Sequence, residues 1–326
     1  MNLEGANILV TGGCGLIGST TIDELLLNNN YKPAKIRILD NMSRGSLRNV
    51  EHSLKDSRVE LVQGDVRDMD AVMKATDGMD AVVHFAAIRI TACAAFPREA
   101  MEVMCDGAYN VIEAAHLKGV KKILAASSAS VYGLADTFPT TEAHHPYNNR
   151  TWYGASKVML EGLLRSFNDM YGTDYVATRY FNVYGPRMDV HGKYTEVLIR
   201  WMERIASGQP PLIFGTGDET MDFINVGDIA RANALGLASD VSDEVFNIAS
   251  GQETSLKQLA YALLKVMKSD LHPEYQPPRA VNPVSRRLAD TSKAERMLGF
   301  KAQIGLEQGL EDLVTWWRAN RASAAV

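Results

Sequence analysis

The 326-residue sequence is poor in cysteine, and its three cysteines have neither disulfide nor metal-ligand spacing. Cys14, Cys93 and Cys105 stand alone along the chain. This excludes a secreted scaffold built on paired thiols and favours a reducing compartment. We expect all three to be small, apolar packing residues.

Long apolar runs and an excess of basic charge are also missing. No stretch approaches the roughly 18 to 20 apolar residues that span a bilayer. The N-terminus has neither the basic segment nor the long apolar segment of a signal peptide. The net charge of -5 provides no excess of positive charge with which to bind nucleic acid or an anionic membrane. We expect a soluble, cytoplasmic protein with no nucleic-acid or membrane partner.

The sequence also lacks an obvious metal site. His144 and His145 are adjacent in an expected loop, without a carboxylate or thiol at ligand spacing, and His84 ends an expected strand. Zinc sites usually draw Cys, His or carboxylate ligands from short, regular spacings. We therefore expect no bound metal.

What the sequence does contain, in its first half, is an alternation of short apolar runs with helix-length amphipathic segments. The apolar runs are β-branched or aliphatic with little polar alternation, which is typical of parallel strands covered on both faces. This pattern predicts an α/β doubly wound (Rossmann) parallel sheet with a ligand crevice beyond the carboxyl ends of its strands. Strands are expected at 7–11, 35–40, 59–63, 81–85, 122–127 and 175–180, and helices at 16–29, 68–77, 98–118 and 153–171.

The alternation breaks after Arg187. Helices are expected at about 195–207, 255–268 and 305–320, a short strand at 211–214, a returning strand at 244–248 and a proline-rich connection at 276–283. We expect a dinucleotide-binding domain over 1–180, with a returning segment near 225–250. A smaller α/β substrate lobe should occupy 181–326.

A glycine-rich turn, T-G-G-C-G-L-I-G-S, directly follows the first expected strand and opens a helix. Gly12, Gly15 and Gly18, with Leu16 and Ile17 between them, allow a tight turn and close backbone approach to a pyrophosphate. The positive helix N-terminus favours that anion. The turn indicates a dinucleotide site.

Two acidic residues sharpen this interpretation. Asp40 ends the second expected strand, 22 residues after Gly18, where a carboxylate can accept hydrogen bonds from both adenosine ribose hydroxyls. An acid there repels a 2′-phosphate, so NAD is favoured over NADP. Arg44 either weakens this preference by offsetting the negative charge, or is solvated. Asp65 ends the third strand and either receives the adenine amino group or caps a helix.

Tyr153 and Lys157 lie four residues apart in W-Y-G-A-S-K. In a helix both side chains lie on one face, one turn apart. The lysine charge favours the phenolate, so we expect it to lower the pKa of Tyr153 and make that residue a general base.

At this point the residues resemble the extended short-chain dehydrogenase/reductase family, especially its nucleotide-sugar epimerases of the UDP-glucose 4-epimerase type. The resemblance spans nearly the whole chain in family order. Its strong matches are T-G-G-C-G-L-I-G, L-D-N, G-D-V-R-D, H-F-A-A, A-S-S-A-S-V-Y-G, Y-G-A-S-K and R-Y-F-N-V-Y-G-P-R; weaker ones are I-F-G-T-G-D, D-F-I-N-V-G-D-I-A, F-N-I-A-S-G and A-D-T-S-K-A.

The resemblance implies a role for each matching position. The expected NAD-binding residues are Gly12, Gly15, Leu16, Ile17, Gly18, Asp40, Asn41, Asp65, Val66, Phe85, Ala86, Ala87, Tyr153, Lys157 and Tyr180. The expected residues for a UDP-sugar are Arg89, Ser128, Ser130, Tyr153, Asn182, Arg187, Phe214 and Arg279. Ser128, Tyr153 and Lys157 form the expected catalytic trio, and the family implies a homodimer.

The positions after Ser128 favour one reaction. Related dehydratases and decarboxylases carry acidic residues there, whereas this chain has Ala129 and Ser130, which cannot perform acid-base chemistry on carbon near neutral pH. We therefore expect 4-epimerisation of a UDP-sugar through a transient 4-keto sugar. The alternatives are a nucleotide-sugar 4-keto reductase or dehydrogenase, and a non-catalytic NAD-sensing module.

One position departs from the family pattern. Met221 stands where such epimerases commonly have an arginine for the diphosphate, and a thioether donates no hydrogen bond. Either another basic residue binds the diphosphate in its place, or the substrate differs from UDP-glucose. Arg279 lies near the family's other diphosphate arginine, with Arg286 and Arg287 as rivals. Three cations could take over this contact, or instead face the carboxylate of a UDP-hexuronate: Arg89, Arg187 and Lys193. Of the two classes of sugar, a neutral UDP-hexose or UDP-N-acetylhexosamine is favoured over a UDP-hexuronate.

Overall fold

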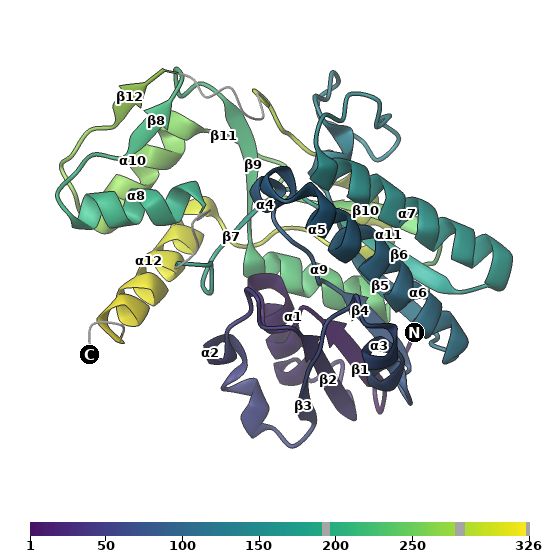
Figure 1. The fold of residues 1–326 in the computed structure, drawn as a ribbon. Coiled ribbons are helices and arrows are strands. Elements are labelled where there is room, and N and C mark those ends of the chain that lie inside the picture. The colour runs from purple at the N-terminus through teal and green to yellow at the C-terminus, as the bar shows by residue number, and fades with distance from the viewer. Residues whose placement is uncertain (191–195, 278–283, 324–326) are drawn as a thin grey trace.

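The centre of the computed structural model is a seven-stranded sheet in which every neighbouring pair of strands is parallel. The structure describes residues 1–190, 196–277 and 284–323. The strand order β10-β6-β5-β4-β1-β2-β3 reverses between β1 and β4 (Figure 1). This confirms the expected doubly wound sheet. Its strands are β1 (Asn7–Thr11), β2 (Lys35–Asp40), β3 (Val59–Gln63), β4 (Ala81–His84), β5 (Lys122–Ser128), β6 (Asp174–Tyr180) and β10 (Glu244–Ile248).

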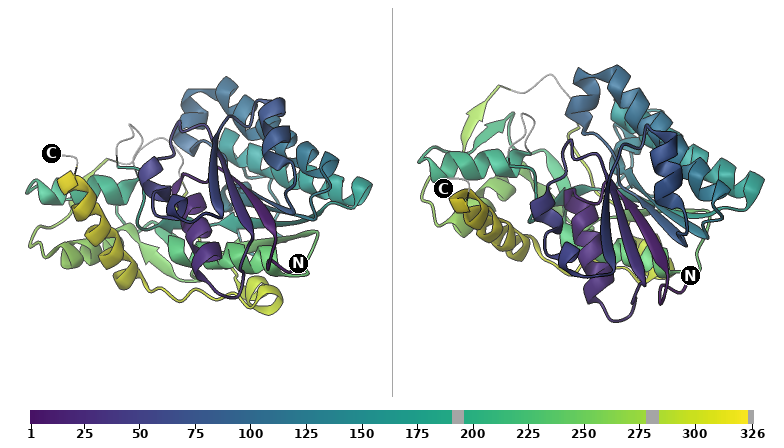
Figure 2. Two further views of the ribbon diagram at one scale, coloured as in Figure 1. Left: turned by 90° about the horizontal axis from the view of Figure 1, so that it is seen from below. Right: turned by 60° about the horizontal axis from the view of Figure 1, so that its bottom comes forward.

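Helices cover both faces of the sheet, because successive strand residues point to opposite sides. Leu9 and Leu39 pack with α3 (Met69–Thr76), α6 (Gly107–Leu117) and α7 (Trp152–Tyr171). Ile8 and Val10 pack on the other side with α1 (Leu16–Leu27) and α9 (Val226–Ala238). In the left view of Figure 2 the blue and teal helices lie above the sheet and the green α9 lies below it. Both faces are therefore apolar, as the sequence pattern predicts.

A second group of elements lies beyond the carboxyl end of the sheet, on the left of Figure 1. Trp201, Leu259 and Leu313 form the centre of its core. Strands β7 (Asn182–Tyr184), β9 (Thr220–Asn225) and β11 (Glu253–Ser255) form one small sheet, and β8 (Leu212–Phe214) and β12 (Glu274–Gln276) form another. The helices that enclose this core are α8 (Val197–Ala206), α10 (Leu256–Met267) and α12 (Leu306–Ser323).

The expected helix over 98–118 is not continuous. Its place is taken by α5 (Pro97–Met101), a π-helical segment, η2 (Glu102–Asp106), and α6, with the unexpected α4 (Ile90–Ala95) before them. Pro97 fits at the start of α5, because the first helical position needs no amide donor. The remaining short helices are α2 (Leu47–Val50), η1 (Ser53–Lys55), η3 (Ala129–Tyr132) and α11 (Ser292–Leu298). Among the described residues, no helix has the length and apolar character needed to cross a bilayer.

Candidate active site

The glycine turn after β1 is closely packed. Gly12 has a φ of +69°, and a Cβ there would lie 2.7 Å from the backbone of the segment after β4. A Cβ on Gly18 would lie 2.4 Å from the Gly12 carbonyl oxygen, so α1 rests directly on the turn. Gly15 is the N-cap of α1 and no side chain caps the helix. The amides of Leu16 and Ile17 therefore lie at the positive end of the helix, where they can bind an anion.

Asp40 ties the loop after β2 to this turn. Its buried carboxylate accepts hydrogen bonds from the amides of Cys14 and Met42, each at 2.9 Å. A carboxylate has about four lone-pair sites, so Asp40 retains acceptor capacity. Its role toward the adenosine ribose stays a prediction.

Asp65 joins the loops that follow β2 and β3. It accepts a hydrogen bond from Nδ2 of Asn41 at 2.9 Å and pairs with Arg67 at 2.8 Å. Hydrogen bonds from Arg67 hold the pKa of this carboxyl well below its ordinary value. The interpretation of Asp65 as a helix cap is wrong, because the side chain of Asp68 caps α3.

The segment after β4 lies beside the glycine turn. Phe85, Ala86 and Ala87 are half-buried there, and the Phe85 amide donates to the carbonyl of Thr11 at 3.0 Å. This is the point where the strand order reverses, which is where doubly wound sheets bind ligands. Val66 is buried close by in the packing against α6.

The structure brings together the three side chains of the expected catalytic trio. Ser128 ends β5, while Tyr153 and Lys157 lie one turn apart near the start of α7. Nζ of Lys157 donates to the Ala126 carbonyl at 2.6 Å and lies 5.7 Å from the centre of the Tyr153 ring. Oγ of Ser128 accepts from the Ser130 amide at 3.1 Å, which orients the serine.

The expected lowering of the Tyr153 pKa is wrong for the protein alone. Burial disfavours the phenolate and raises the pKa of Tyr153 to about 12, although a hydrogen bond with Ser128 acts in the opposite direction. Burial also lowers the pKa of Lys157 to about 8. The ammonium of Lys157 donates to a strand carbonyl, and the charges that lower the pKa of Tyr153 are those of two arginines.

Arg287 is one of those charges. It lies close enough to Tyr153 to lower the phenol pKa, as does Arg44. Burial lowers the pKa of Arg287 to about 10. Among the described residues its guanidinium forms no ion pair, whereas Arg286 turns away and pairs with Glu253. Neighbouring residues of an extended segment point to opposite sides, so only one arginine of this pair faces the crevice.

Tyr180 and Asn182 both make hydrogen bonds within the protein. The hydroxyl of Tyr180, at the carboxyl end of β6, donates to Oδ1 of Asn233 at 2.6 Å, and Asn233 donates to Thr21 on α1. Nδ2 of Asn182 donates to the Asp222 carbonyl at 3.1 Å and thereby links β7 to β9. Their expected contacts with nicotinamide and diphosphate stay predictions.

A pocket of about 370 Å³ opens between the start of α4, α8 and β8. Arg89 and Phe214, both expected to bind the substrate, contribute to its lining. Arg89 pairs with Asp189 at 3.7 Å and Glu196 at 3.6 Å. Asp189 also lies 4.0 Å from Arg44. Acidic and basic side chains from both parts of the chain therefore meet at one edge of the pocket.

The other expected cations are placed differently. Arg187 pairs with Asp23 of α1 at 2.5 Å, which ties the segment after β7 to the glycine-turn helix. Lys193 and Arg279 lie outside the described residues. The sequence alone did not distinguish Arg287 from Arg286, because the direction of each side chain depends on how this segment pairs with β9.

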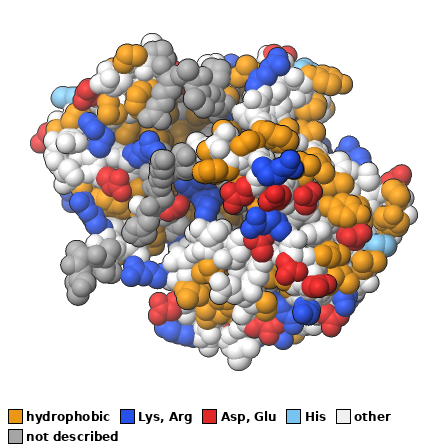
Figure 3. All heavy atoms as spheres, in the orientation of Figure 1, with side chains coloured by type: hydrophobic (Ala, Val, Ile, Leu, Met, Phe, Trp, Pro, Cys, Tyr) orange, Lys and Arg blue, Asp and Glu red, His pale blue; other side chains and the backbone are white. Residues whose placement is uncertain are grey.

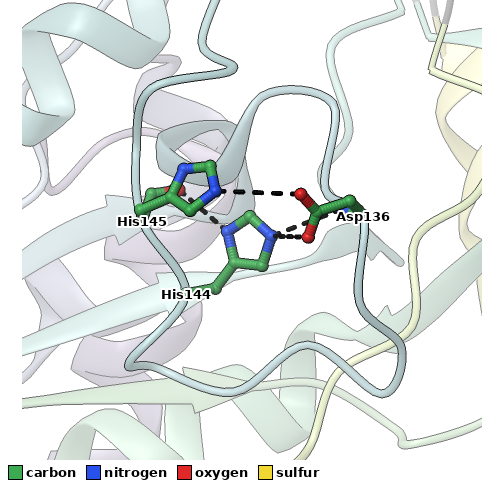
Figure 4. A group of neighbouring side chains, drawn as sticks. All are labelled: Asp136, His144 and His145. Carbon is green, nitrogen blue, oxygen red and sulfur yellow. Dashed lines mark hydrogen bonds and ion pairs between the residues drawn. The ribbon is translucent and has the colours of Figure 1, made fainter.

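The fold also places a carboxylate beside the histidine pair (Figure 4). Asp136, His144 and His145 offer ligand atoms that all lie within 4.8 Å of one another. The sequence has no carboxylate at ligand spacing from these histidines, but the fold brings Asp136 into contact with His144. The loop turns back on itself, so eight residues of sequence separation become a direct contact at 2.9 Å.

Known proteins resemble the chain along nearly its whole length. It is 32% identical to the UDP-glucose 4-epimerase of Mycolicibacterium smegmatis, over 95% of this chain and 98% of that protein. A UDP-N-acetylglucosamine 4-epimerase from Methanobrevibacter ruminantium, solved with UDP-N-acetylmuramic acid, has a TM-score of 0.90 and 32% identity, covering 97% and 99% of the two chains. A UDP-glucose 4-epimerase from Thermotoga maritima, solved with UDP-glucose, has a TM-score of 0.88, the same identity and the same coverage.

The model of the NAD dependent epimerase/dehydratase family matches residues 8–249. This range contains the glycine turn, the trio of Ser128, Tyr153 and Lys157, and the returning strand β10. The chain belongs to the NAD-dependent epimerase/dehydratase family.

Proposed function

We propose that the protein catalyses NAD-dependent 4-epimerisation of a UDP-sugar through a transient 4-keto sugar. The observation that carries this proposal is the placement of Ser128, Tyr153 and Lys157 at the carboxyl edge of the sheet, where Tyr153 packs against the same buried cluster as the segment after β4. Relatives named as UDP-sugar 4-epimerases support it.

The residues around the glycine turn fit NAD. Gly12 and Gly18 leave no space for a Cβ, so the backbone alone shapes the turn at the start of α1. Asp40 supplies a buried carboxylate beside that turn, as expected for a ribose without a 2′-phosphate. When bound, NAD supplies reversible acceptance of a hydride from the sugar. We assign the pyrophosphate to Gly12, Gly15 and Gly18 and the adenosine to Asp40 and Asp65.

The three catalytic side chains handle the proton. Tyr153 takes the proton of the C4 hydroxyl as this carbon is oxidised, and returns it when the ketone is reduced on its other face. Ser128 holds the same oxygen and is positioned by the amide of Ser130. Lys157, fixed by the Ala126 carbonyl, positions the nicotinamide ribose.

The residues next to Ser128 support epimerisation over elimination. Ala129 and Ser130 are both buried, and neither can remove a proton from carbon near neutral pH. Reduction of a free ketone by the same trio is the competing function, and a non-catalytic NAD sensor would leave the assembled trio without a role.

We assign the nucleotide end of the substrate to the pocket between α4, α8 and β8. Phe214 offers an aromatic face for a base, and Arg89, Arg200 and Arg204 bring positive charge for a diphosphate. This assignment makes residues 1–180, with the segment near 225–250, the dinucleotide-binding part, and 181–326 the substrate lobe.

The cation beside Tyr153 bears on the class of sugar. Arg286 forms a β-bridge with Thr220 of β9, and the amide of Arg287 donates to the Thr220 carbonyl, one residue before Met221, where the family arginine is missing. Because Arg287 also shifts the pKa of Tyr153, it lies near the reacting sugar. The sequence favours a neutral hexose or N-acetylhexosamine, whereas a cation in this place favours a hexuronate, because it can pair with the sugar carboxylate.

The test is turnover without added cofactor. Purified protein should interconvert C4 epimers from a panel of neutral and acidic UDP-sugars, followed by chromatography, without consuming NADH. The Tyr153→Phe variant should lose turnover by at least about a hundredfold and still bind NAD in a fluorescence titration. Activity that requires stoichiometric NADH would instead identify a 4-keto reductase, and normal turnover of the variant would remove Tyr153 from the mechanism.

We further propose a homodimer formed through α6 and α7. Apolar side chains gather over these helices on the right of Figure 3, and the exposed ones include Tyr109, Leu117, Met159, Met170 and Tyr171. A patch of this kind on two long helices is typical of a self-association surface. A dimer mass by light scattering, reduced to a monomer mass by Met170→Glu with Tyr171→Glu, is the expected result; a wild-type monomer contradicts it.

A further inference from the structure

We propose that Asp136, His144 and His145 bind a divalent transition-metal ion such as Zn²⁺. The three residues belong to the loop between η3 and α7, and their side chains converge on one point (Figure 4). Imidazole nitrogen and carboxylate oxygen are common protein ligands of zinc. The proposed site is separate from the crevice assigned to NAD and the sugar.

The spacing of the ligand atoms matches such an ion. Metal–ligand bonds of about 2.0 to 2.1 Å in a tetrahedral site separate neighbouring ligand atoms by about 3.3 Å. Nε2 of His144 lies 2.9 Å from one Asp136 carboxylate oxygen, and Nε2 of His145 lies 3.7 Å from the other. These two distances lie on either side of that value, and all three ligand atoms lie within 4.8 Å of one another, so side-chain rotations can bring them to one ion.

The hydrogen bonds of His144 leave its Nε2 directed at the proposed ion. Nδ1 lies 2.8 Å from the His145 carbonyl, which only accepts, so Nδ1 carries a proton and donates. Nε2 then lies 2.9 Å from the Asp136 carboxylate and 3.3 Å from the Asp136 amide, which donates toward it. Nε2 is therefore the ring nitrogen on the side of Asp136, and a bond from Nδ1 to a carbonyl is the usual support for a metal-binding histidine.

The three side chains differ in burial, so one side of the site is held by the protein and the other is open to solvent. The His144 side chain is 5% exposed and packs edge-on against Tyr132. His145 and Asp136 are 44% and 60% exposed. An ion can therefore enter from solvent and keep water in its remaining coordination position. Tyr132 in turn accepts a hydrogen bond from Arg179, so the buried side of the site is connected to the core of the protein.

The site would join two arms of the loop that separates Ser128 from Tyr153. Asp136 lies on the outgoing arm and the histidines on the returning arm, in the chain segment between the two catalytic side chains. Metal binding would hold these arms together and raise the thermal midpoint of the protein. None of the three residues is placed in the proposed catalytic machinery.

The experiment is a titration of untagged protein with Zn²⁺ in competition with a chromophoric chelator, supported by the visible absorption of bound Co²⁺. We expect one equivalent to bind. Affinity should fall at least about tenfold in Asp136→Asn and in His145→Asn. The control is His52→Asn, which removes an exposed histidine elsewhere and should bind as the wild type does.

Thermal melting followed by circular dichroism distinguishes loss of the metal site from loss of the fold. The metal-free melting midpoints of all four proteins should agree within a few degrees, while Zn²⁺ should raise the midpoint of the wild type and of His52→Asn alone. Absence of stoichiometric binding to the wild type would overturn the proposal. Equal affinity in the wild type, Asp136→Asn and His145→Asn would also overturn it.

Discussion

The reactivity of Tyr153 depends on two opposing effects at a single phenol. Burial raises its pKa to about 12, while the positive charges of Arg287 and Arg44 lower it. Lys157 is held at a strand carbonyl and has its own pKa lowered to about 8 by burial. Removal of the charge of Arg287 or of Arg44 should therefore appear in the pH dependence of the enzyme.

The first prediction concerns the cation beside Tyr153. Arg287→Gln should shift the acidic limb of the kcat/KM profile to higher pH, because loss of a positive charge raises the pKa of the base. Loss of a charged hydrogen bond to an acidic sugar should also lower kcat/KM for a UDP-hexuronate by roughly 10- to 100-fold. The effect on a neutral UDP-hexose should be smaller.

Arg286→Gln is the matched control, since Arg286 is the adjacent residue and pairs with Glu253 away from the crevice. Steady-state assays of both variants between pH 6 and 10 provide the comparison. If the two variants have the same pH profile and the same sugar preference, Arg287 does not act at the reacting sugar.

At the scale of elements, an ion pair anchors the helix that carries Tyr153 and Lys157. Glu161 lies one turn after Lys157 on α7, and Arg179 on β6 donates to its two oxygens at 2.8 and 2.6 Å. Both side chains are nearly buried, 13% and 10% exposed. Ser127, next to Ser128 on β5, donates to the same carboxylate. One residue thus fixes the register of α7 against two strands.

The second prediction follows from the burial of this pair. Glu161→Gln leaves the Arg179 charge without a compensating charge, which should lower the free energy of unfolding by about 3 kcal/mol. Glu307→Gln is the control, because the pair of Glu307 with Lys265 is exposed and should contribute little. Urea denaturation measures both variants. Equal midpoints for the two variants would contradict a structural role of the buried pair.

The elements that the sequence predicts well are those with an unambiguous apolar pattern. The run at 7–11 is a buried strand bounded by the glycine turn, and the structure gives it the same limits. The interruption of the expected helix over 98–118 could not be predicted. A π-helical segment such as 102–106 changes the backbone hydrogen bonds by one residue and leaves the residue types unchanged.

In the candidate active site and the proposed metal site, too, the sequence predicts local side-chain contacts but not those between distant segments. Tyr153 and Lys157 could be paired from sequence because helical geometry relates positions four apart. The relation of Arg287 to Tyr153, and of Asp136 to His144, depends on how distant or looping segments fold back. No local spacing encodes those contacts. The pKa of Tyr153 was mispredicted for a related reason, since burial is a property of the whole fold.

At the scale of the whole molecule, acidic and basic side chains connect the sheet with the lobe. Arg44 follows β2 and Arg89 precedes α4, whereas Asp189 and Glu196 belong to the chain after β7. The ion pairs among them measure 3.6 to 4.0 Å. If the diphosphate binds in the pocket as proposed, it competes with these carboxylates for Arg89, and substrate binding is then coupled electrostatically to the contact between the two parts.

The last prediction concerns the stability of the whole fold toward acid. His84 is buried at the end of β4, and its Nδ1 lies 2.8 Å from Oγ1 of Thr11. Burial, followed by the nearby charge of Lys157, lowers the pKa of His84 to about 3. An unfolded histidine has a pKa of about 6.5. Between these two values the unfolded chain binds a proton that the folded protein does not, so stability falls as the pH drops through this window.

At pH 5 this single group should lower the free energy of unfolding by about 2 kcal/mol relative to pH 7. In His84→Asn that contribution disappears, so the loss between pH 7 and pH 5 should be smaller by the same amount, whatever the absolute stability of the variant. Carboxylates and the other histidines titrate in both proteins and cancel in the comparison. Urea denaturation at the two pH values measures the difference, with His52→Asn as the exposed control. An equal loss in the wild type and in His84→Asn would show that His84 accepts a proton in the folded protein, and would place its side chain in contact with solvent.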